Sequence, residues 1–242
     1  MDHVLEARGL EKRFGRKIAV RDVSFSMRTG QVTGLLGPNG AGKTTVFYMI
    51  VGFLSPNGGA VYLDHHLLSA LPMYRRARLG IAYLPQEPSV FRKMTVEQNV
   101  RAVLETRTDL NAAERNDALD GLLEEFGIDS LRRQYAYTLS GGERRRTEIA
   151  RALAIKPKFL LLDEPFAGID PIAVHEIKGI VRRLSGKGIG ILITDHNVRD
   201  TLDITHDAHI IHQGQILVSG DRDAILASDL ARQIYLGEAF RM

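Results

Sequence analysis

The sequence contains no cysteine, and its first residues, MDHVLEARGLEKRF, carry charges where a secretory leader would place an apolar segment. We therefore expect the chain to stay in the cytosol. Long hydrophobic runs are also missing. The longest nearly apolar ones, such as MIVGFL, fall far short of the roughly 18 residues needed to cross a bilayer. Any role at a membrane would have to come through a partner.

A large excess of one charge is missing as well, since the sequence has 32 lysines and arginines and 29 aspartates and glutamates. This balance is typical of a mixed, solvated surface and does not argue for nucleic-acid binding. Repeats, low-complexity tracts and long linkers are absent. What the chain does have is 242 residues with 44% hydrophobic content, enough to bury the core of one domain, or of one domain with a small subdomain.

Hydrophobic patterning predicts strands toward both ends of the chain and helices in the middle. Alternating runs in the first thirty residues favour antiparallel strands, and QVTGLLG predicts a buried strand, followed by a glycine loop and a helix that ends before Pro56. The pattern is helical from about Glu87 to Lys156. Apolar runs in FLLLDEP and GILITDH are typical of parallel strands, and the last strands predict a hairpin turning at Gln213 and Gly214.

A phosphate-binding motif lies between the first buried strand and its helix. Gly37, Gly42, Lys43 and Thr44 match the pattern G-x-x-x-x-G-K-[ST] in the strand-to-helix context that the motif requires. Its glycines let backbone N–H groups close on phosphates, and Lys43 would reach the β- and γ-phosphates. Thr44 can place its hydroxyl on Mg²⁺. The predicted nucleotide-binding residues here are Gly37, Pro38, Asn39, Gly40, Ala41, Gly42, Lys43, Thr44 and Thr45.

Acidic and imidazole side chains follow the two later buried strands. Ligands bind at the carboxyl edge of open parallel sheets, which makes Asp163 a candidate magnesium ligand, direct or through water. Its neighbour Glu164 is a candidate general base for water, or alternatively a simple acid at a helix N-terminus. His196 ends the other strand and is expected to contact the γ-phosphate, although a lone histidine is more often structural.

The stretch LSGGERRR predicts the start of a second helix that could hold an anion. A capping box of Ser140 with Glu143 explains the serine and the glutamate. It does not explain Gly141 and Gly142, which lower helix propensity by about 1 kcal/mol each. Such glycines are expected only where another group must approach the backbone closely. With no lysine of its own, the site is expected to complete another site. Arginines 144–146 are expected on the exposed and flanking faces, with partner contacts as the alternative.

Six motifs in this order resemble the ATP-binding subunits of ABC transporters over nearly the whole chain: GPNGAGKTT, YLPQ, LSGGE, FLLLDEP, AGID and ITDH. In that family two subunits sandwich two ATP molecules head to tail. The resemblance therefore implies a homodimer in which Ser140, Gly141 and Gly142 bind the γ-phosphate held by the other copy. Asp170 would lie across the region of the dimer axis.

The same resemblance implies an ATPase coupled to transmembrane transport. Gln86 would contact magnesium and the attacking water, which makes Thr44, Gln86 and Asp163 the expected Mg²⁺ ligands. Phe14 would stack on adenine where the family commonly has tyrosine. The implied partners are two transmembrane permease subunits, with no nucleic acid and with membrane contact only through those partners.

Motifs and patterning together predict an α/β fold: a P-loop nucleotide core with a mostly parallel sheet, an antiparallel β subdomain and an inserted α-helical subdomain. We expect one domain over residues 1–242. Residues 1–86 and 157–242 would form the core with the antiparallel strands, and residues 87–156 would form the helical subdomain.

Within the family, segments such as YLPQEPSVFRKMTVEQN and the tail YLGEAFR resemble the ATPase subunits of lipopolysaccharide exporters. That implies a peripheral place on the cytoplasmic face of the inner membrane, driving lipopolysaccharide extraction. The alternative within transporters is the ATPase of a branched-chain amino acid importer. A soluble ABC ATPase acting on DNA or ribosomes is the alternative from another class, disfavoured by a single cassette and by the absence of sustained heptads.

One segment carries the expected contact with a partner. Phe91 and Arg92 lie in a loop-like stretch between Pro88 and the expected helix cap at Thr95, so the large ring should be poorly covered by this chain. As the resemblance implies, Phe91 would line a groove between subdomains that receives a short helix of the membrane subunit. The alternative is that Phe91 folds back into the core of the helical subdomain.

Overall fold

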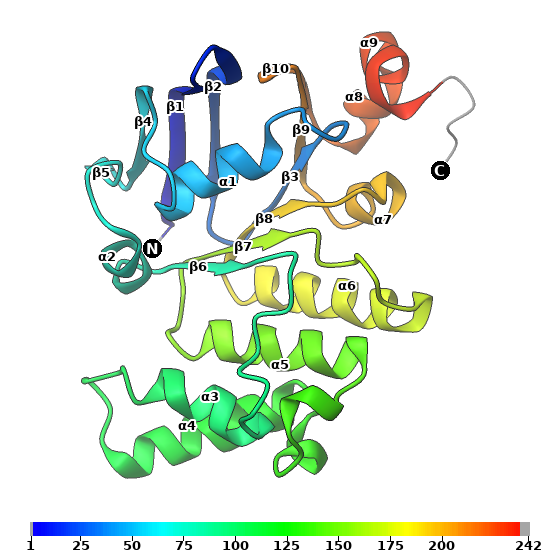
Figure 1. Ribbon diagram of the computed structural model, residues 1–242. Helices are drawn as coiled ribbons and strands as arrows, with labels where there is room; N and C mark the ends of the chain where they lie inside the picture. Colours follow the sequence, from blue (N-terminus) through cyan, green and yellow to red (C-terminus); the bar gives the residue numbers. More distant parts are fainter. Residues whose placement is uncertain (1, 238–242) are drawn as a thin grey trace.

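The computed structural model describes residues 2–237, and its strands form two sheets with helices between and below them (Figure 1). The first sheet is antiparallel and has the order β2-β1-β4-β5. Its strands are β1 (Val4–Phe14), β2 (Lys17–Arg28), β4 (Gly58–Leu63) and β5 (His66–Leu67). The expected antiparallel strands of the first thirty residues are thus confirmed.

The second sheet has six strands in the order β10-β9-β3-β8-β7-β6. Strands β6, β7, β8, β3 and β9 run parallel, and β3, β7 and β8 are buried along their whole length, as their continuous apolar runs predict. Strand β10 pairs antiparallel with β9 through the expected turn at Gln213 and Gly214. The strands are β3 (Val32–Leu36), β6 (Ile81–Leu84), β7 (Phe159–Asp163), β8 (Gly190–Thr194), β9 (Asp207–His212) and β10 (Gln215–Gly220).

Helices surround the second sheet and also form a layer of their own (Figure 1). The predicted helical middle holds α3 (Val96–Leu104), α4 (Ala112–Glu125) and α5 (Gly141–Leu153), with short 3₁₀ turns η1 (Asp129–Leu131) and η2 (Ala136–Thr138). The remaining helices are α1 (Lys43–Val51), α2 (Met73–Arg78), α6 (Pro171–Gly186), α7 (Val198–Leu202), α8 (Arg222–Ala227) and α9 (Asp229–Ala231), with a π-helical turn η3 (Arg232–Leu236).

Local sequence sets where these helices begin. Capping boxes at Thr95 and Asn111 start α3 and α4, and Ser140 with Glu143 starts α5 in the expected way. The apolar face of α4 then packs against α3, which also packs against α5, in one core that continues to the sheet face covered by α6. A second core lies on the other face, between the two sheets and around α1.

These layers confirm the expected α/β class: a mostly parallel nucleotide core, an antiparallel β subdomain and a set of inserted helices. We propose that residues 87–156 form the helical subdomain, in line with the positions of α3, α4 and α5. Within residues 2–237, no helix is long and apolar enough to cross a membrane. Of the tail YLGEAFR, residues 238–241 lie outside the described part of the chain.

Candidate nucleotide-binding site and adjoining groove

The loop from β3 to α1 forms the predicted phosphate cradle. Its backbone requires glycine at both ends: Gly37 has φ 153° and Gly42 has φ 111°. A Cβ on Gly37 would lie 2.1 Å from the Ile211 carbonyl oxygen, and one on Gly42 would lie 2.7 Å from that of Ala19. The loop is therefore pressed against β9 and β2 and can keep its shape only without side chains at these positions.

Lys43 begins α1 and points back into this loop. Its Nζ donates hydrogen bonds to the carbonyl oxygens of Gly37, at 2.6 Å, and Pro38, at 3.0 Å. Burial lowers the pKa of Lys43, while the carboxylates of Glu164 and Asp163 oppose that effect. The ammonium is thus fixed over the cradle and faces the acidic edge of the sheet.

A cavity of about 440 Å³ opens above the loop. Phe14, at the end of β1, is 48% exposed and lines one side of this cavity. Residues 39–45 of the loop and helix line the other side, together with Glu164 and Gln213. The sequence did not single out Lys17, Ile18, Ala19 or Gln213 as lining residues, because the antiparallel strands and the β9–β10 turn reach the loop only in the folded chain.

Glu164 stands at the centre of the acidic edge. Its backbone adopts a left-handed conformation, with φ 47°, and its N–H donates to the Thr194 carbonyl oxygen at 2.8 Å. One side-chain oxygen accepts from Gln86 Nε2 at 2.7 Å, and the other lies 2.7 Å from His196 Nε2. Gln86 and His196, which were predicted separately, thus both contact the Glu164 carboxylate. An uncommon backbone conformation of Glu164 orients this side chain.

Asp163, the last residue of β7, is held by a residue that the sequence analysis missed. Tyr83 of β6 donates a hydrogen bond from its hydroxyl to Asp163 Oδ2 at 3.1 Å. Burial raises the pKa of Asp163, and the Tyr83 hydrogen bond opposes that rise. Burial, together with the nearby Asp163 charge, also raises the pKa of Tyr83, so the phenol stays protonated as a donor.

Asp195 is a second missed residue, although it stands beside His196 in the motif ITDH. Its carboxylate is buried and accepts hydrogen bonds from the backbone N–H groups of Phe166 and Asn197, both at 2.9 Å. It thereby ties the loop after β7 to the loop after β8. This tie keeps Glu164 and His196 on facing loops at a fixed separation.

The expectation that arginines 144–146 lie on exposed faces is wrong for Arg145, which is only 6% exposed. Its guanidinium donates to the carbonyl oxygens of Pro85, at 2.9 Å, and Asp163, at 3.3 Å, and pairs with Glu148 at 3.1 Å. Because Asp163 ends β7 and Pro85 precedes Gln86, Arg145 links α5 to the sheet edge that carries Gln86, Asp163 and Glu164. We call this edge the nucleotide edge. Arg146 is partly exposed and pairs with Glu176 at 2.6 Å.

The glycines at the start of α5 have a reason within this chain. A Cβ on Gly142 would lie 3.0 Å from the Ala173 Cβ of α6, and one on Gly141 would lie 3.3 Å from Ile169. The residues that line the cavity above the phosphate loop do not include Ser140, Gly141 or Gly142. Asp170 caps α6 by accepting from the N–H groups of residues 172 and 173. One chain therefore does not bring these four residues to its own Lys43.

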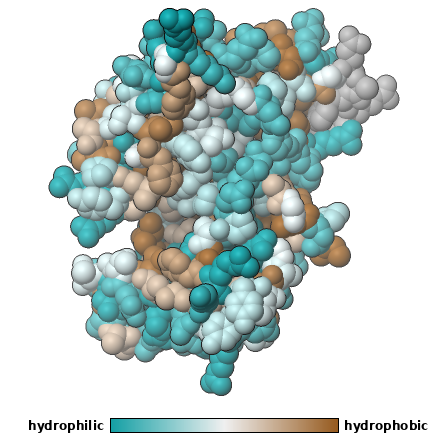
Figure 2. Space-filling view, in the orientation of Figure 1, coloured by the Kyte–Doolittle hydropathy of each residue, from teal (hydrophilic) through white to brown (hydrophobic). Residues whose placement is uncertain are grey.

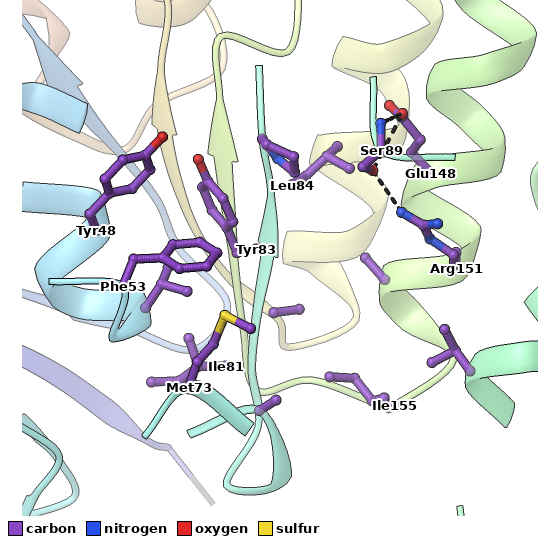
Figure 3. Close-up of a pocket in the computed structure, with 16 residues that line it drawn as sticks. Tyr48, Phe53, Met73, Ile81, Tyr83, Leu84, Ser89, Glu148, Arg151 and Ile155 are labelled. Carbon is purple, nitrogen blue, oxygen red and sulfur yellow. Dashed lines mark hydrogen bonds between the residues drawn. The ribbon is translucent and has the colours of Figure 1, made fainter. Parts of the chain in front are cut away.

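A second cavity of about 440 Å³ is an apolar groove between the core and the inserted helices (Figure 3). Tyr48, Phe53 and Tyr83 form one wall with their rings edge to face. On the other side, Arg151 donates to the Ser89 hydroxyl at 2.7 Å, and Glu148 accepts from Ser89. Tyr83 thus belongs both to this groove and to the nucleotide edge.

Phe91 lies beside Arg151, a residue that lines this groove, and not in the core of the helical subdomain. Its ring is 48% exposed, and the Arg151 guanidinium lies over it, 4.9 Å from the ring centre. The Asn99 side chain fixes its loop, because its Oδ1 accepts from the Phe91 N–H and its Nδ2 donates to the Phe91 carbonyl oxygen. Arg92 beside it is exposed. The alternative in which Phe91 folds back into the core is therefore wrong.

Comparison with known proteins matches residues 20–167 to the family described as "ABC transporter". The chain belongs to the ABC transporter family. It is 58% identical to a probable ABC transporter ATP-binding protein of Azorhizobium caulinodans, covering 98% of this chain and 84% of that one. It is also 53% identical to the lipopolysaccharide export system ATP-binding protein LptB of Acidithiobacillus ferridurans, with both chains covered completely.

The fold agrees with this family. The ADP conformation of an ATP-binding cassette of an ABC transporter superposes with a TM-score of 0.86 at 30% identity, covering 98% of this chain and 99% of that one. As a member of the family this chain is an ATPase, and its hydrolysis of ATP is coupled to transport.

Proposed function

We propose that this ATPase drives lipopolysaccharide extraction from the cytoplasmic face of an inner membrane. The observation that carries the proposal is the 53% identity over both complete chains to a protein named for lipopolysaccharide export. Such full-length similarity favours lipopolysaccharide over branched-chain amino acids as the cargo. The balanced charge of the sequence, 32 basic against 29 acidic residues, disfavours a soluble ATPase acting on DNA or ribosomes.

Water attacks the γ-phosphate directly, with Glu164 as the general base. The hydrogen bond donated by Gln86 and the contact with His196 Nε2 hold that carboxylate at the edge of the cavity that contains Lys43. Lys43 supplies positive charge to the phosphates, and the N–H groups of the glycine loop surround them. His196 contacts the transferred phosphoryl group, and Phe14 stacks on the adenine. No phosphoenzyme is needed.

Mg²⁺ fits the oxygen donors present at this edge: the Thr44 hydroxyl, the Asp163 carboxylate and the side-chain carbonyl of Gln86. Gln86 uses its Nε2 on Glu164, which leaves its carbonyl oxygen to turn toward a cation. When bound, the ion neutralises charge on the β- and γ-phosphates. The hydrogen bond from Tyr83 favours the charged form of Asp163 that this role needs.

The working unit in this proposal is a homodimer with two ATP sites. Ser140, Gly141 and Gly142 lie at the N-terminus of α5, away from the cavity lined by their own phosphate loop. A helix N-terminus offers free N–H groups and a positive dipole end to an anion. A two-fold partner would bring this end to the γ-phosphate held by the first copy, with Asp170 near the axis.

In the homodimer, the groove of each copy receives a short helix from one of the two membrane subunits. Its apolar floor suits the apolar face of such a helix. Phe91 and Arg92 are exposed, and the Phe91 ring lies beside the lining residue Arg151. Two routes lead from the groove to Asp163: the hydroxyl of Tyr83, and the pair Glu148–Arg145. Contact with the membrane thus occurs through partners, and the nucleotide edge responds to the occupant of the groove.

The test is to purify the tagged chain in mild detergent and to identify the co-purifying proteins and lipid by mass spectrometry. Two membrane subunits with bound lipopolysaccharide are expected. Recovery with amino acid permeases would instead support an importer, and recovery with ribosomes or DNA without membrane proteins would overturn the transport proposal.

A further inference from the structure

The turn between β9 and β10 reaches the nucleotide cavity, although it lies far along the chain from the phosphate loop. Gln213 and Gly214 are its two residues, because His212 at the end of β9 pairs with Gln215 at the start of β10. Gln213 is exposed and lines the cavity above the phosphate loop. The turn thus places one polar side chain beside the expected nucleotide.

Backbone hydrogen bonds fasten this turn to two neighbouring segments. The Gly214 N–H donates to the Ala41 carbonyl oxygen of the phosphate loop at 2.9 Å, and the Gly214 carbonyl oxygen accepts from the Arg21 N–H of β2 at 2.8 Å. A Cβ on Gly214 would lie 2.8 Å from the Ala19 carbonyl oxygen, so the turn is pressed against β2. Gln213 is therefore held at a fixed place relative to the phosphate loop.

The turn lies between the places expected for the base and for the phosphates. Ala41 belongs to the phosphate loop, whereas Ala19 lies on the hairpin of β1 and β2 that carries Phe14 near its tip. This tip is at the top of the molecule, where the surface is mainly hydrophilic (Figure 1, Figure 2). In ATP the sugar joins the base to the phosphates. A side chain on a turn that is fixed to both segments is therefore placed beside the sugar.

Turn chemistry does not account for a glutamine at this position. Gln213 has φ 48° and Gly214 has φ 81°, and two-residue hairpin turns with both angles positive favour Asn, Asp or Gly in first place. A longer side chain in the left-handed region adds strain, which is often kept at functional sites. Within residues 2–237, the Gln213 side-chain amide forms no hydrogen bond. Its donor and its acceptor are both free for a ligand.

We propose that the Gln213 amide recognises the sugar of ATP through hydrogen bonds with its 2′- and 3′-hydroxyls. A carboxamide offers a donor and an acceptor, and two neighbouring hydroxyls can each donate and accept, so the groups match as a pair. Phe14 offers only the face of its ring and cannot distinguish one sugar from another. Gln213 is thus the residue that selects ribonucleotides over deoxynucleotides. This inference rests on the proposed function, because it deepens the nucleotide site described there.

The experiment compares the wild-type chain with Gln213→Gly, which removes the amide and suits the left-handed turn. KM and kcat are measured for ATP, 2′-deoxy-ATP and 3′-deoxy-ATP. With the wild-type chain, each deoxy analogue should raise KM about threefold to tenfold, the effect of one lost hydrogen bond, and should leave kcat nearly unchanged. Gln213→Gly should show a raised KM for ATP itself and no further rise for either analogue.

Thermal unfolding separates recognition from a structural role. Gln213→Gly relieves strain, so its melting temperature should equal or exceed that of the wild-type chain. Gln215→Ala changes an exposed glutamine that does not line the cavity, and it should discriminate among the three nucleotides as the wild-type chain does. A lower melting temperature of Gln213→Gly with the wild-type ratios of KM would show that the residue only shapes the turn, and would overturn the inference.

Two other results would also contradict recognition of the sugar. One is an unchanged KM for ATP in a stable Gln213→Gly chain. The other is a variant that loses discrimination between ATP and GTP but still rejects the deoxy analogues, since Gln213 would then contact the base. Failure of the proposed nucleotide site is recognised separately, because Lys43→Ala would then still bind ATP whatever Gln213 does.

Discussion

The hydroxyl of Tyr83 donates a hydrogen bond to Asp163 Oδ2 at 3.1 Å, while the ring of the same tyrosine lies in the groove wall beside Phe53. One side chain therefore contacts the carboxylate expected to serve magnesium and also the surface expected to receive a partner. A helix pressing on the Tyr83 ring would change the charge environment of Asp163 without touching the nucleotide.

Tyr83→Phe should keep the ring and remove only the hydrogen bond. That bond favours the charged form of Asp163, so its loss raises the pKa of a carboxyl that burial already raises. Catalysis that needs the carboxylate should then fail at a higher pH. We expect turnover to fall about tenfold at neutral pH and the acid limb of the ATPase pH profile to move upward.

The control for this change is Tyr62→Phe, in β4 of the antiparallel sheet, which should leave the profile unchanged. An unshifted acid limb in Tyr83→Phe would show that the hydroxyl does not tune Asp163.

The phosphate cradle and the strand ends could be predicted from the sequence because their signals are local. The spacing of Gly37, Gly42 and Lys43 within one loop specifies both the backbone and the chemistry. The capping box of Ser140 with Glu143 spans only one turn and is confirmed. The prediction that Asp163 lies at the carboxyl edge of a parallel sheet is also confirmed, because β7 pairs parallel with β8 and Asp163 is opposite Thr194.

Arg145 and Tyr83 could not be predicted because their partners are distant in sequence. Arg145 looks like one of three similar arginines, and only the approach of Pro85 and Asp163 buries it. Tyr83 meets Asp163 through the pairing of β6 with β7, a neighbour relation that the sequence alone does not give. Asp195 could have been predicted, because an acidic residue that directly follows a buried strand needs hydrogen-bond donors such as the Phe166 N–H.

Glu164→Gln should bind ATP but lower turnover by roughly 10² to 10⁴, the usual effect of losing a general base. The variant should also accumulate an ATP-bound dimer, because hydrolysis normally reopens it. Steady-state ATPase assays and size-exclusion chromatography with ATP measure both effects. Glu124→Gln, on the exposed side of α4, is the matched control. Hydrolysis at a near wild-type rate would remove Glu164 from the role of base.

Ser140→Arg should leave ATP binding by the isolated chain intact and abolish ATP-dependent dimerisation, because the defect lies in the site of the other copy. Mixing it with a Lys43→Ala chain restores one complete site per mixed dimer. The mixture should therefore dimerise with ATP when neither variant does alone. Lost nucleotide binding by the Ser140→Arg monomer would place the start of α5 at its own phosphate loop and contradict the shared site.

Arg145→Leu should destabilise the fold by about 3 to 5 kcal/mol, since it leaves Glu148, 2% exposed, without its cation. Denaturant unfolding measures the change in the free energy of unfolding. Adding Glu148→Leu should recover part of the loss by removing the unpaired charge. Arg144→Leu, on the same turn of α5, should change stability by no more than about 0.5 kcal/mol. An equally mild effect of Arg145→Leu would show that the buried pair adds little to stability.

Phe91→Ala tests the partner surface. Phe91 is 48% exposed and its ring lies under the Arg151 guanidinium, so the isolated variant should fold and hydrolyse ATP normally. Truncating an aromatic that becomes buried in an interface costs about 2 to 4 kcal/mol of binding, enough to lose a complex at cellular concentrations. We therefore expect weaker assembly with the membrane subunits and loss of export.

Two measurements on Phe91→Ala decide between the outcomes. Thermal unfolding of the isolated variant reports its fold, and co-purification with the membrane subunits reports assembly. Leu217→Ala, a truncation of an exposed apolar side chain on β10, is the control and should affect neither. A large drop in melting temperature would mean that Phe91 supports the fold after all. Unchanged co-purification with full transport would remove Phe91 from the interface, and the partner helix would then have to be held by the groove wall around Tyr83 instead.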